Sequence, residues 1–331
     1  MLSNSKFRPA WWLRNPHAQT FWAAKVQRGP TPETIEERIN TPDGDFLDLS
    51  WVNGIDHNQS NQPVVVIFHG LGGSVRSKYV QSLMHYLNAN NVRAVLMHFR
   101  GCSAEPNNTP GSYHSAHTTD IRFIIDTVKN RFPNSSIAAA GYSLGGNALL
   151  KYLATEPGNP LCFAVSVSPP LLPREGAMRM NQGISKIYQR VLLETMKEAA
   201  RAKHKRHPQF KLDELNFESA SDFFEFDHQV TAPLHGFDSG EDYYSRASTL
   251  SDLINIKTPT HILWARDDPF FSEKCIPTNE QLSKDVNFEL TSHGGHVAFV
   301  SGRKPANGYN WLCNRVGTLL TSQFDSAMKA G

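Results

Sequence analysis

One serine in this sequence stands where its surroundings could make it a nucleophile. Ser143 is the third residue of segment 141–146, GYSLGG, which contains the pattern G-x-S-x-G. The apolar run Ile137–Ala140 precedes this segment and the helical stretch Asn147–Ala154 follows it. This order predicts a sharp strand-to-helix turn, where glycines are needed because larger side chains would collide with the strand and the helix. The turn raises the serine hydroxyl above a sheet, near a helix N-terminus that favours developing negative charge.

The base that would activate this serine is predicted to be His296. A serine hydroxyl is a weak nucleophile until a neighbouring base takes its proton. His296 follows the last predicted strand, Asn287–Leu290, in a loop whose two glycines let it reach over the sheet edge. His293 lies in the same loop and is expected to cap or brace it.

The acid that would orient the imidazole is predicted to be Asp268. The predicted strand Thr260–Trp264 is followed by segment 265–269, ARDDP. Asp268 is favoured because it lies just beyond the expected bend and because Pro269 stiffens its backbone. Asp267 is expected to cap the turn.

Two backbone amides are predicted to bind the oxyanion of an acyl-transfer reaction. The first belongs to Leu144, the residue after the serine. The second belongs to Leu71, in the segment 69–73, HGLGG, which follows the predicted strand Val64–Phe68. Glycines in this loop let backbone amides approach a substrate closely.

Composition narrows the class of protein. The 331 residues are 40% hydrophobic and 19% charged, which suffices for a packed core in two domains or in one domain with an insertion. The net charge of +2 argues against a nucleic-acid partner. Four cysteines without a CxxC pair indicate neither a disulfide framework nor a zinc knuckle. No apolar run reaches the about 18 residues that span a bilayer, and the N-terminus lacks a signal-peptide core, so a cytoplasmic location is expected.

The elements that must position these residues alternate between strands and helices, a pattern that predicts a parallel sheet covered by helices. The strand at Phe46–Val52 follows a hairpin signal and is expected to lie in an antiparallel edge pair. Continuous apolar runs predict strands buried on both faces. The remaining predicted strands are Val64–Phe68, Ala94–Phe99, Ile137–Ala140, Phe163–Val167, Thr260–Trp264 and Asn287–Leu290. The predicted helices are Lys78–Asn88, Thr118–Asn130 and Asn147–Ala154.

One connection, from Pro169 to Thr258, is far longer than a crossover between neighbouring strands requires. Apolar residues from Ile184 to Ala199 recur at helical spacing, so a helical cap is predicted over residues 171–246. The core is then formed by residues 41–170 and 247–331, and residues 1–40 are an N-terminal extension packed on it. The basic run at 201–207 is expected to be a solvated last turn of the cap helix, with anionic lipid or RNA binding as the alternative.

Two further patterns allow a second interpretation. The pairs His293/His296 and His114/His117 are spaced like metal ligands, but neither HExxH nor a clustered carboxylate accompanies them, so no metal and no organic cofactor are predicted. Three tryptophans lie in the first 22 residues. They are expected to fold back onto the body of the protein, with peripheral membrane contact as the alternative.

Together these segments resemble the α/β-hydrolase superfamily, and within it the YheT-like branch, called α/β-hydrolase family 4. The resemblance extends from about residue 15 to about residue 315, and it implies a mostly parallel eight-stranded sheet flanked by helices with an inserted helical cap. It also implies a triad of Ser143, Asp268 and His296. The strings that carry it are segments 15–20 (NPHAQT), 42–46 (PDGDF), 97–103 (MHFRGCS), 105–107 (EPN), 141–146 (GYSLGG), 225–227 (EFD), 242–244 (DYY) and 293–296 (HGGH).

Related eukaryotic members of this branch are membrane-anchored lipases, phospholipases or acyltransferases, and bacterial members are described as esterases. The expected activity is therefore hydrolysis of small carboxylic esters with short to medium acyl chains, in lipid metabolism. The alternatives are a thioesterase or alcohol acyltransferase on the same triad, and a non-catalytic binding module of the same fold.

Overall fold

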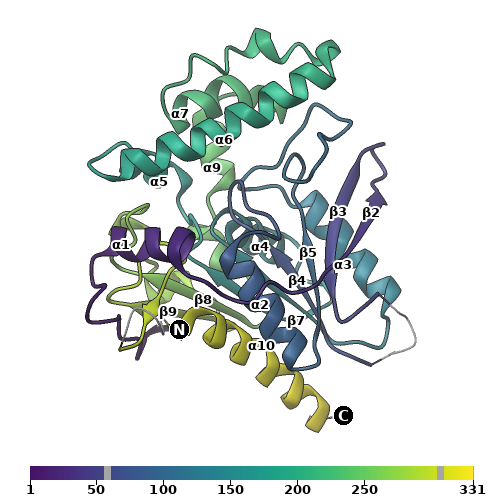
Figure 1. The fold of residues 1–331 in the computed structure, drawn as a ribbon, viewed down its shortest axis with the longest axis vertical. Coiled ribbons are helices and arrows are strands. Elements are labelled where there is room, and N and C mark those ends of the chain that lie inside the picture. The colour runs from purple at the N-terminus through teal and green to yellow at the C-terminus, as the bar shows by residue number, and fades with distance from the viewer. Residues whose placement is uncertain (56–60, 304–308, 331) are drawn as a thin grey trace.

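The computed structural model of the protein describes residues 1–55, 61–303 and 309–330, and a twisted sheet runs through its centre (Figure 1). The sheet has nine strands in the described residues, in the order β1-β9-β8-β7-β6-β4-β5-β3-β2. Neighbours from β1 to β5 are parallel, whereas β3 pairs antiparallel with β5 and with β2. The strands are β1 (Leu2–Asn4), β2 (Ile35–Asn40), β3 (Phe46–Val52), β4 (Val64–Phe68), β5 (Arg93–Met97), β6 (Ile137–Tyr142), β7 (Leu161–Val167), β8 (Thr260–Ala265) and β9 (Val286–Thr291). A separate pair joins β10 (Val300–Ser301) to β11 (Tyr309–Asn310).

Helices cover both faces of the sheet, which explains the continuous apolar strands. In β4, Val64, Val66 and Phe68 lie in one core with the helices α3 and α4. Val65 and Ile67 lie in the other core with α2 and α10. Alternate residues of a strand point to opposite faces, so a strand covered on both sides has no polar face. The helices are α2 (Lys78–Ala89), α3 (Thr119–Arg131), α4 (Leu144–Thr155) and α10 (Trp311–Ala330).

A layer of helices between β7 and β8 lies above the sheet at the top of Figure 1. Its own small apolar core includes Leu193, Phe226 and Val230. We call residues 171–246 the cap, as the sequence predicts, although this boundary stays a prediction. Its helices are α5 (Pro173–Met180), α6 (Ser185–Arg206), α7 (Phe223–Phe226), α8 (Ala232–Leu234) and α9 (Gly240–Ala247).

The predicted count of eight strands is wrong, because β1 adds a ninth at the edge. Leu2–Asn4 runs parallel to β9, with Leu2 opposite Phe288. Three residues are too few to show a periodic pattern, and this strand is held through its backbone. The segment 1–40 therefore contributes two strands, β1 and β2, to the sheet.

The tryptophan-rich segment near the N-terminus lies against the body of the protein. The indole N–H groups of Trp11 and Trp12 donate hydrogen bonds to the carbonyls of Arg303 and Gly302. Phe7 packs edge-on against Phe299. Nevertheless, Trp11 is 69% exposed. None of the helices in the described ranges is both long and apolar enough to cross a bilayer.

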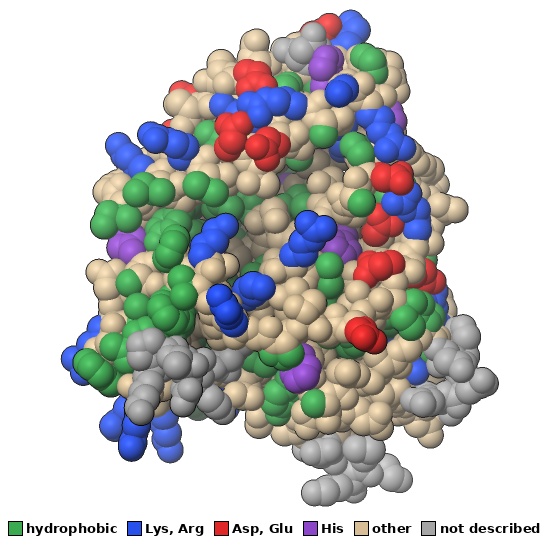
Figure 2. All heavy atoms as spheres, viewed as in Figure 1, with side chains coloured by type: hydrophobic (Ala, Val, Ile, Leu, Met, Phe, Trp, Pro, Cys, Tyr) green, Lys and Arg blue, Asp and Glu red, His purple; other side chains and the backbone are tan. Residues whose placement is uncertain are grey.

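Exposed apolar side chains gather on one side of the face shown in Figure 2, over the region that α1 (Pro16–Phe21) and α6 occupy in Figure 1. They include Phe21 in α1, Ile184 at the N-cap of α6, and Ile187 and Val191 within α6, each more than half exposed. Peripheral membrane contact remains a prediction.

Candidate active site

Ser143 occupies the turn between β6 and α4, and its backbone is strained there. Its φ of 50° and ψ of −120° are rare for a residue other than glycine. Its amide donates to the carbonyl of Val167 in β7, and its own carbonyl accepts the amide of Asn147 in α4. The sheet and the helix thus hold the turn from both sides, which is how a strained backbone persists.

The glycines around Ser143 allow this close packing. A Cβ on Gly145 would lie 2.3 Å from the carbonyl oxygen of His69, and one on Gly141 would lie 2.7 Å from that of Gly145. A Cβ on Gly146 would lie 2.6 Å from the hydroxyl of Ser166. All three distances are too short for real contacts, so the pattern read from the sequence has a steric basis at each glycine.

The three side chains predicted as a triad lie in hydrogen-bonding contact. The hydroxyl of Ser143 donates to His296 Nε2 at 2.9 Å, and His296 Nδ1 donates to Asp268 Oδ2 at 2.8 Å. The carboxylate of Asp268 is fully buried and also accepts the amide of Phe270. This arrangement fixes the imidazole tautomer that leaves a lone pair for the serine proton.

The loop that carries His296 is braced from one side by the Asp267–Phe271 segment. The ring of Phe270 stacks on the imidazole of His296, with centroids 4.0 Å apart. Asp267 accepts the amide of Gly295 and lies 3.2 Å from the imidazole of His293. Asp267 and His293 thus brace the loop, whereas Asp268 contacts His296, which in turn contacts Ser143.

The same loop is held from the other side by α1, a support that sequence analysis missed. The amide of His296 donates to Thr20 Oγ1 at 3.0 Å, and the amide of Val300 donates to Gln19 Oε1. A Cβ on Gly295 would lie 2.7 Å from the carbonyl oxygen of Pro16, so only glycine allows this contact. The available signal was the string at 15–20, which carried the family resemblance without an assigned role.

The HGLGG loop is also pinned, by the first residue of the motif. Fully buried His69 donates from Nδ1 to the carbonyl of Gly70 and accepts the amide of Phe99 at Nε2. Burial lowers the pKa of His69 to about 3, so the ring is neutral and its tautomer is fixed. Leu71 and Leu144, the predicted oxyanion donors, both line the pocket at Ser143.

A pocket of about 760 Å³, including its mouth, opens at Ser143, and the cap forms much of its wall. Most of its lining is apolar, as in sites that take small organic ligands. Helices α5, α6, α7 and α9 all contribute, and Phe270 and Phe271 close the side near His296. The cap residues in the wall include Ala177, Met180, Leu192, Met196, Phe223, Tyr243 and Tyr244.

Comparison with known proteins places this geometry in a family. Residues 63–302 match the family described as alpha/beta hydrolase fold. The chain is also 37% identical over 327 residues to the Escherichia coli (strain K12) protein named "Putative esterase YheT", covering 98% of this chain and 95% of that protein. This chain belongs to the α/β-hydrolase family, in its YheT-like branch. The predicted family and fold class are therefore confirmed.

Two further similarities extend the comparison of this α/β-hydrolase. Phospholipase ABHD3 of Mus musculus is 27% identical over 305 residues, covering 90% of this chain and 74% of that protein. The solved structure of the Pyrococcus furiosus esterase Pf2001 superimposes with a TM-score of 0.54 at 17% identity, covering 90% of this chain and 97% of that one. The second similarity supports the fold alone.

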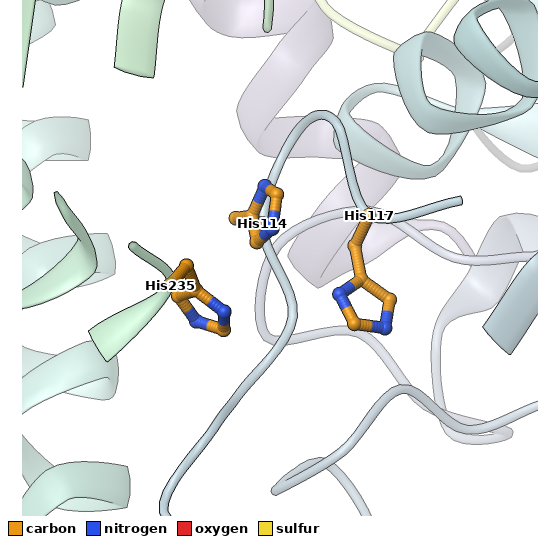
Figure 3. A group of neighbouring side chains, drawn as sticks. All are labelled: His114, His117 and His235. Carbon is orange, nitrogen blue, oxygen red and sulfur yellow. The ribbon is translucent and has the colours of Figure 1, made fainter. Parts of the chain in front are cut away.

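The two histidine pairs weighed as metal ligands have different surroundings in the hydrolase. His293 and His296 each face their own aspartate. His114 and His117 instead lie beside a third histidine, His235, which belongs to the cap (Figure 3).

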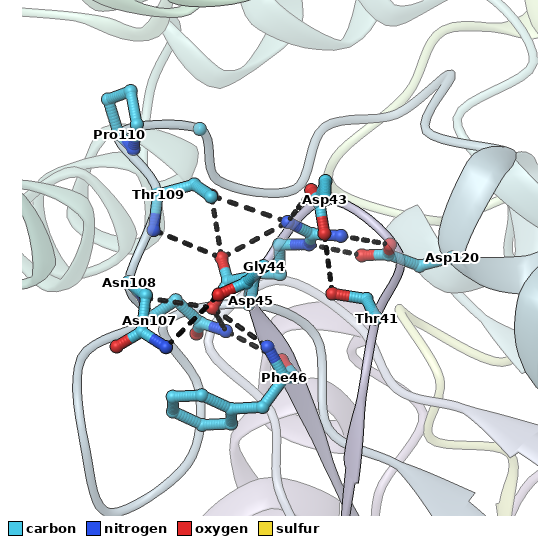
Figure 4. Close-up of polar contacts among 12 residues, drawn as sticks. Thr41, Asp43, Gly44, Asp45, Phe46, Asn107, Asn108, Thr109, Pro110 and Asp120 are labelled. Atoms are coloured by element: carbon cyan, nitrogen blue, oxygen red, sulfur yellow. Dashed lines mark hydrogen bonds and ion pairs between the residues drawn. The ribbon is translucent and has the colours of Figure 1, made fainter.

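The loop that carries His114 and His117, residues 107–118, is anchored to the hydrolase core by a polar cluster (Figure 4). The buried carboxylate of Asp45 accepts hydrogen bonds from the side chains of Asn107 and Thr109 and from the amide of Asn108. Arg100 lies beside it and makes a bidentate pair with buried Asp120. The buried charges of this cluster are thus paired, and the first residues of the loop are held to the core by hydrogen bonds.

The cap contacts this loop through the basic run at the end of α6, so the expectation of a solvated turn is wrong for Lys203. Its ammonium group donates to the carbonyls of Pro110 and Gly111, and its side chain is buried. Burial lowers the pKa of Lys203 to about 8. The neighbouring Arg201 does lie at the surface, where it pairs with Glu194 and Glu218.

One pocket residue with a perturbed pKa was not singled out from the sequence. Asp227, in the cap, accepts hydrogen bonds from the hydroxyls of Thr231 and Tyr244. Burial nevertheless raises the pKa of Asp227 to about 6. The folded protein therefore binds this proton more tightly than the unfolded chain does, so the free energy of unfolding falls as the pH rises from about 4 through about 6.

We expect Asp227→Asn to remove this fall of the unfolding free energy with rising pH. From about pH 5 to about pH 8, the wild type should lose roughly 1–2 kcal/mol of unfolding free energy that the variant keeps. Urea unfolding at both pH values measures the difference, with Glu214→Gln, at an exposed cap carboxylate, as the control. Parallel pH profiles for wild type and Asp227→Asn would contradict the assignment.

Proposed function

We propose that this hydrolase cleaves small carboxylic esters through an acyl-enzyme formed on Ser143, with His296 as the base and Asp268 as the acid. The observation that carries the proposal is the pair of contacts that joins the three side chains, at 2.9 Å and 2.8 Å. The enzyme class, a hydrolase acting on esters, is supported by the family and by esterase and lipase relatives.

In the proposed first step, Ser143 Oγ attacks the acyl carbonyl while His296 Nε2 takes its proton. Asp268 stabilises the imidazolium that forms, without taking the proton itself. The backbone amides of Leu71 and Leu144 donate to the oxyanion. His296 then gives its proton to the leaving alcohol, and the acyl-enzyme remains.

In the second step, His296 Nε2 takes a proton from water, and the hydroxide attacks the acyl-enzyme carbonyl. The acid leaves when Ser143 Oγ regains its proton from the imidazolium. An alcohol in place of water would give acyl transfer, and a thiol leaving group would make the enzyme a thioesterase. The apolar wall that the cap contributes to the pocket supports short to medium acyl chains as the substrate class.

Labelling with a fluorophosphonate probe tests the nucleophile. The wild type should label stoichiometrically and Ser143→Ala should not, because the probe reacts only with an activated serine. Ser74→Ala, in the nearby loop, is the matched control and should label normally. An intact, folded protein that fails to label would favour the binding-module alternative.

Substitution of Thr20 tests whether α1 positions the base. Thr20→Val keeps the side-chain shape but removes the acceptor of the His296 amide, so kcat for a p-nitrophenyl ester should fall about tenfold with little change in KM. Thr20→Ser should restore most of the activity. Thr34→Val, at a hydroxyl that contacts only exposed Glu36 in the described structure, should behave like wild type. Equal kcat for Thr20→Val and wild type would exclude this role.

A chain-length series from acetate to palmitate tests the acyl pocket. We expect kcat/KM to peak at short to medium chains. Met196→Trp, which fills the pocket, should lower kcat/KM for octanoate about tenfold and leave acetate nearly unchanged. The control is Met178→Trp, at an exposed position of α5. A uniform loss for every ester would argue that the acyl chain lies elsewhere.

A further inference from the structure

Three histidines from two parts of the chain meet where the cap touches the core. His114 and His117 belong to the anchored loop 107–118, and His235 follows α8 in the cap. One ring nitrogen from each lies within 4.8 Å of the other two. In Figure 3, a nitrogen of His117 and one of His235 face the space between the two rings. None of these residues belongs to the proposed triad or donates to the proposed oxyanion.

The surroundings of His117 are those of a metal-ligating histidine. Its Nε2 lies 3.1 Å from Oδ2 of Asp120, a carboxylate that is 1% exposed and held by Arg100. His117 Nε2 makes no well-aligned hydrogen bond with this carboxylate, but the nearby negative charge favours a proton on that nitrogen, which leaves the other nitrogen a free lone pair. The carboxylate–histidine pair is a common support of zinc ligands in proteins.

The other two imidazoles are available as neutral ligands. His114 Nδ1 accepts the amide of Ala116 at 3.3 Å, and His235 Nε2 accepts that of Ser112 at 3.4 Å. Both contacts are long and therefore weak. A metal bond to either ring would break at most the one hydrogen bond that this ring accepts.

Of the cations near the cluster, Arg100 and Arg246 are paired with carboxylates, whereas the Lys203 ammonium group is held by the carbonyls of Pro110 and Gly111 and its charge opposes a bound ion. Arg100 pairs with Asp43, Asp45 and Asp120. Arg246 pairs with Asp242, on the preceding turn of α9.

We propose that His114, His117 and His235 bind a divalent transition-metal ion of the zinc type, which joins the cap to the core. Three imidazoles suit such an ion, with a water as the fourth ligand. Nitrogens about 2 Å from a tetrahedral ion lie roughly 3.3 Å from each other, so the rings must rotate inward from their present separation. Since His114 also lines the acyl pocket, the ion ties the pocket wall to the loop beneath it.

Metal binding by the full-length, untagged protein tests this proposal independently of ester hydrolysis. After treatment with a chelator, dialysis against Zn²⁺ should load one ion per chain, and Zn²⁺ should raise Tm by about 2 °C or more. Co²⁺ in place of Zn²⁺ should give the intense visible bands of a tetrahedral site. A wild type that binds no stoichiometric ion overturns the proposal.

Variants identify the ligands. His117→Ala and His235→Ala should each retain less than a tenth of the bound ion, whereas His85→Ala, at an exposed histidine of α2, should keep all of it. His235→Cys should bind Co²⁺ with an added sulfur-to-cobalt charge-transfer band, a signal that a merely structural residue cannot produce. Equal loading of wild type, His117→Ala and His235→Ala, or no such band in a loaded His235→Cys protein, overturns the assignment.

Discussion

The orientation of one imidazole ring, that of His296, is the constraint on which the rest of this structure depends. The ring can accept the Ser143 proton only while its other nitrogen keeps a proton for Asp268. Segments far apart in the chain hold this ring. Thr20 Oγ1 accepts a hydrogen bond from the backbone amide of His296, and Phe270 covers the ring face. The loop that carries His296 is thereby held in place although it contains glycines, because one contact restricts its backbone and another restricts the imidazole ring.

Backbone strain accompanies this rigidity on both sides of the Ser143–His296 contact. Ser143 has a positive φ, and so do Val297 and Phe299 in the histidine loop. A β-branched residue such as Val297 rarely adopts this conformation, which costs of order 1–3 kcal/mol. Such costs persist only where packing over-determines the backbone, and buried Phe299 does this by packing against Phe7. The N-terminal extension therefore stabilises the site as well as the sheet.

The sequence predicts most of the fold because its signals are local. Buried strands such as Val64–Phe68 are continuous apolar runs, and Ser143 stands between glycines whose steric role can be argued from the pattern alone. The predicted contact partners Asp268 and His296 followed from their places after strands. The ninth strand, Leu2–Asn4, and the support from Thr20 escaped prediction because both depend on backbone hydrogen bonds between distant segments, which leave no periodic trace.

The cap is joined to the core by apolar packing, such as Tyr188 against Phe270, and also by polar contacts. Two apolar layers stabilise the sheet, whereas Lys203 and His235 reach from the cap to backbone groups of the loop 107–118. The Lys203 side chain is buried, so breaking its contacts leaves an unsatisfied group that costs about 1–3 kcal/mol, whereas the 3.4 Å contact of His235 is weak. The loop can accept them only because Asp45 has already fixed its backbone. The wall of the pocket at Ser143 thus includes a loop that is held by a buried carboxylate outside the pocket.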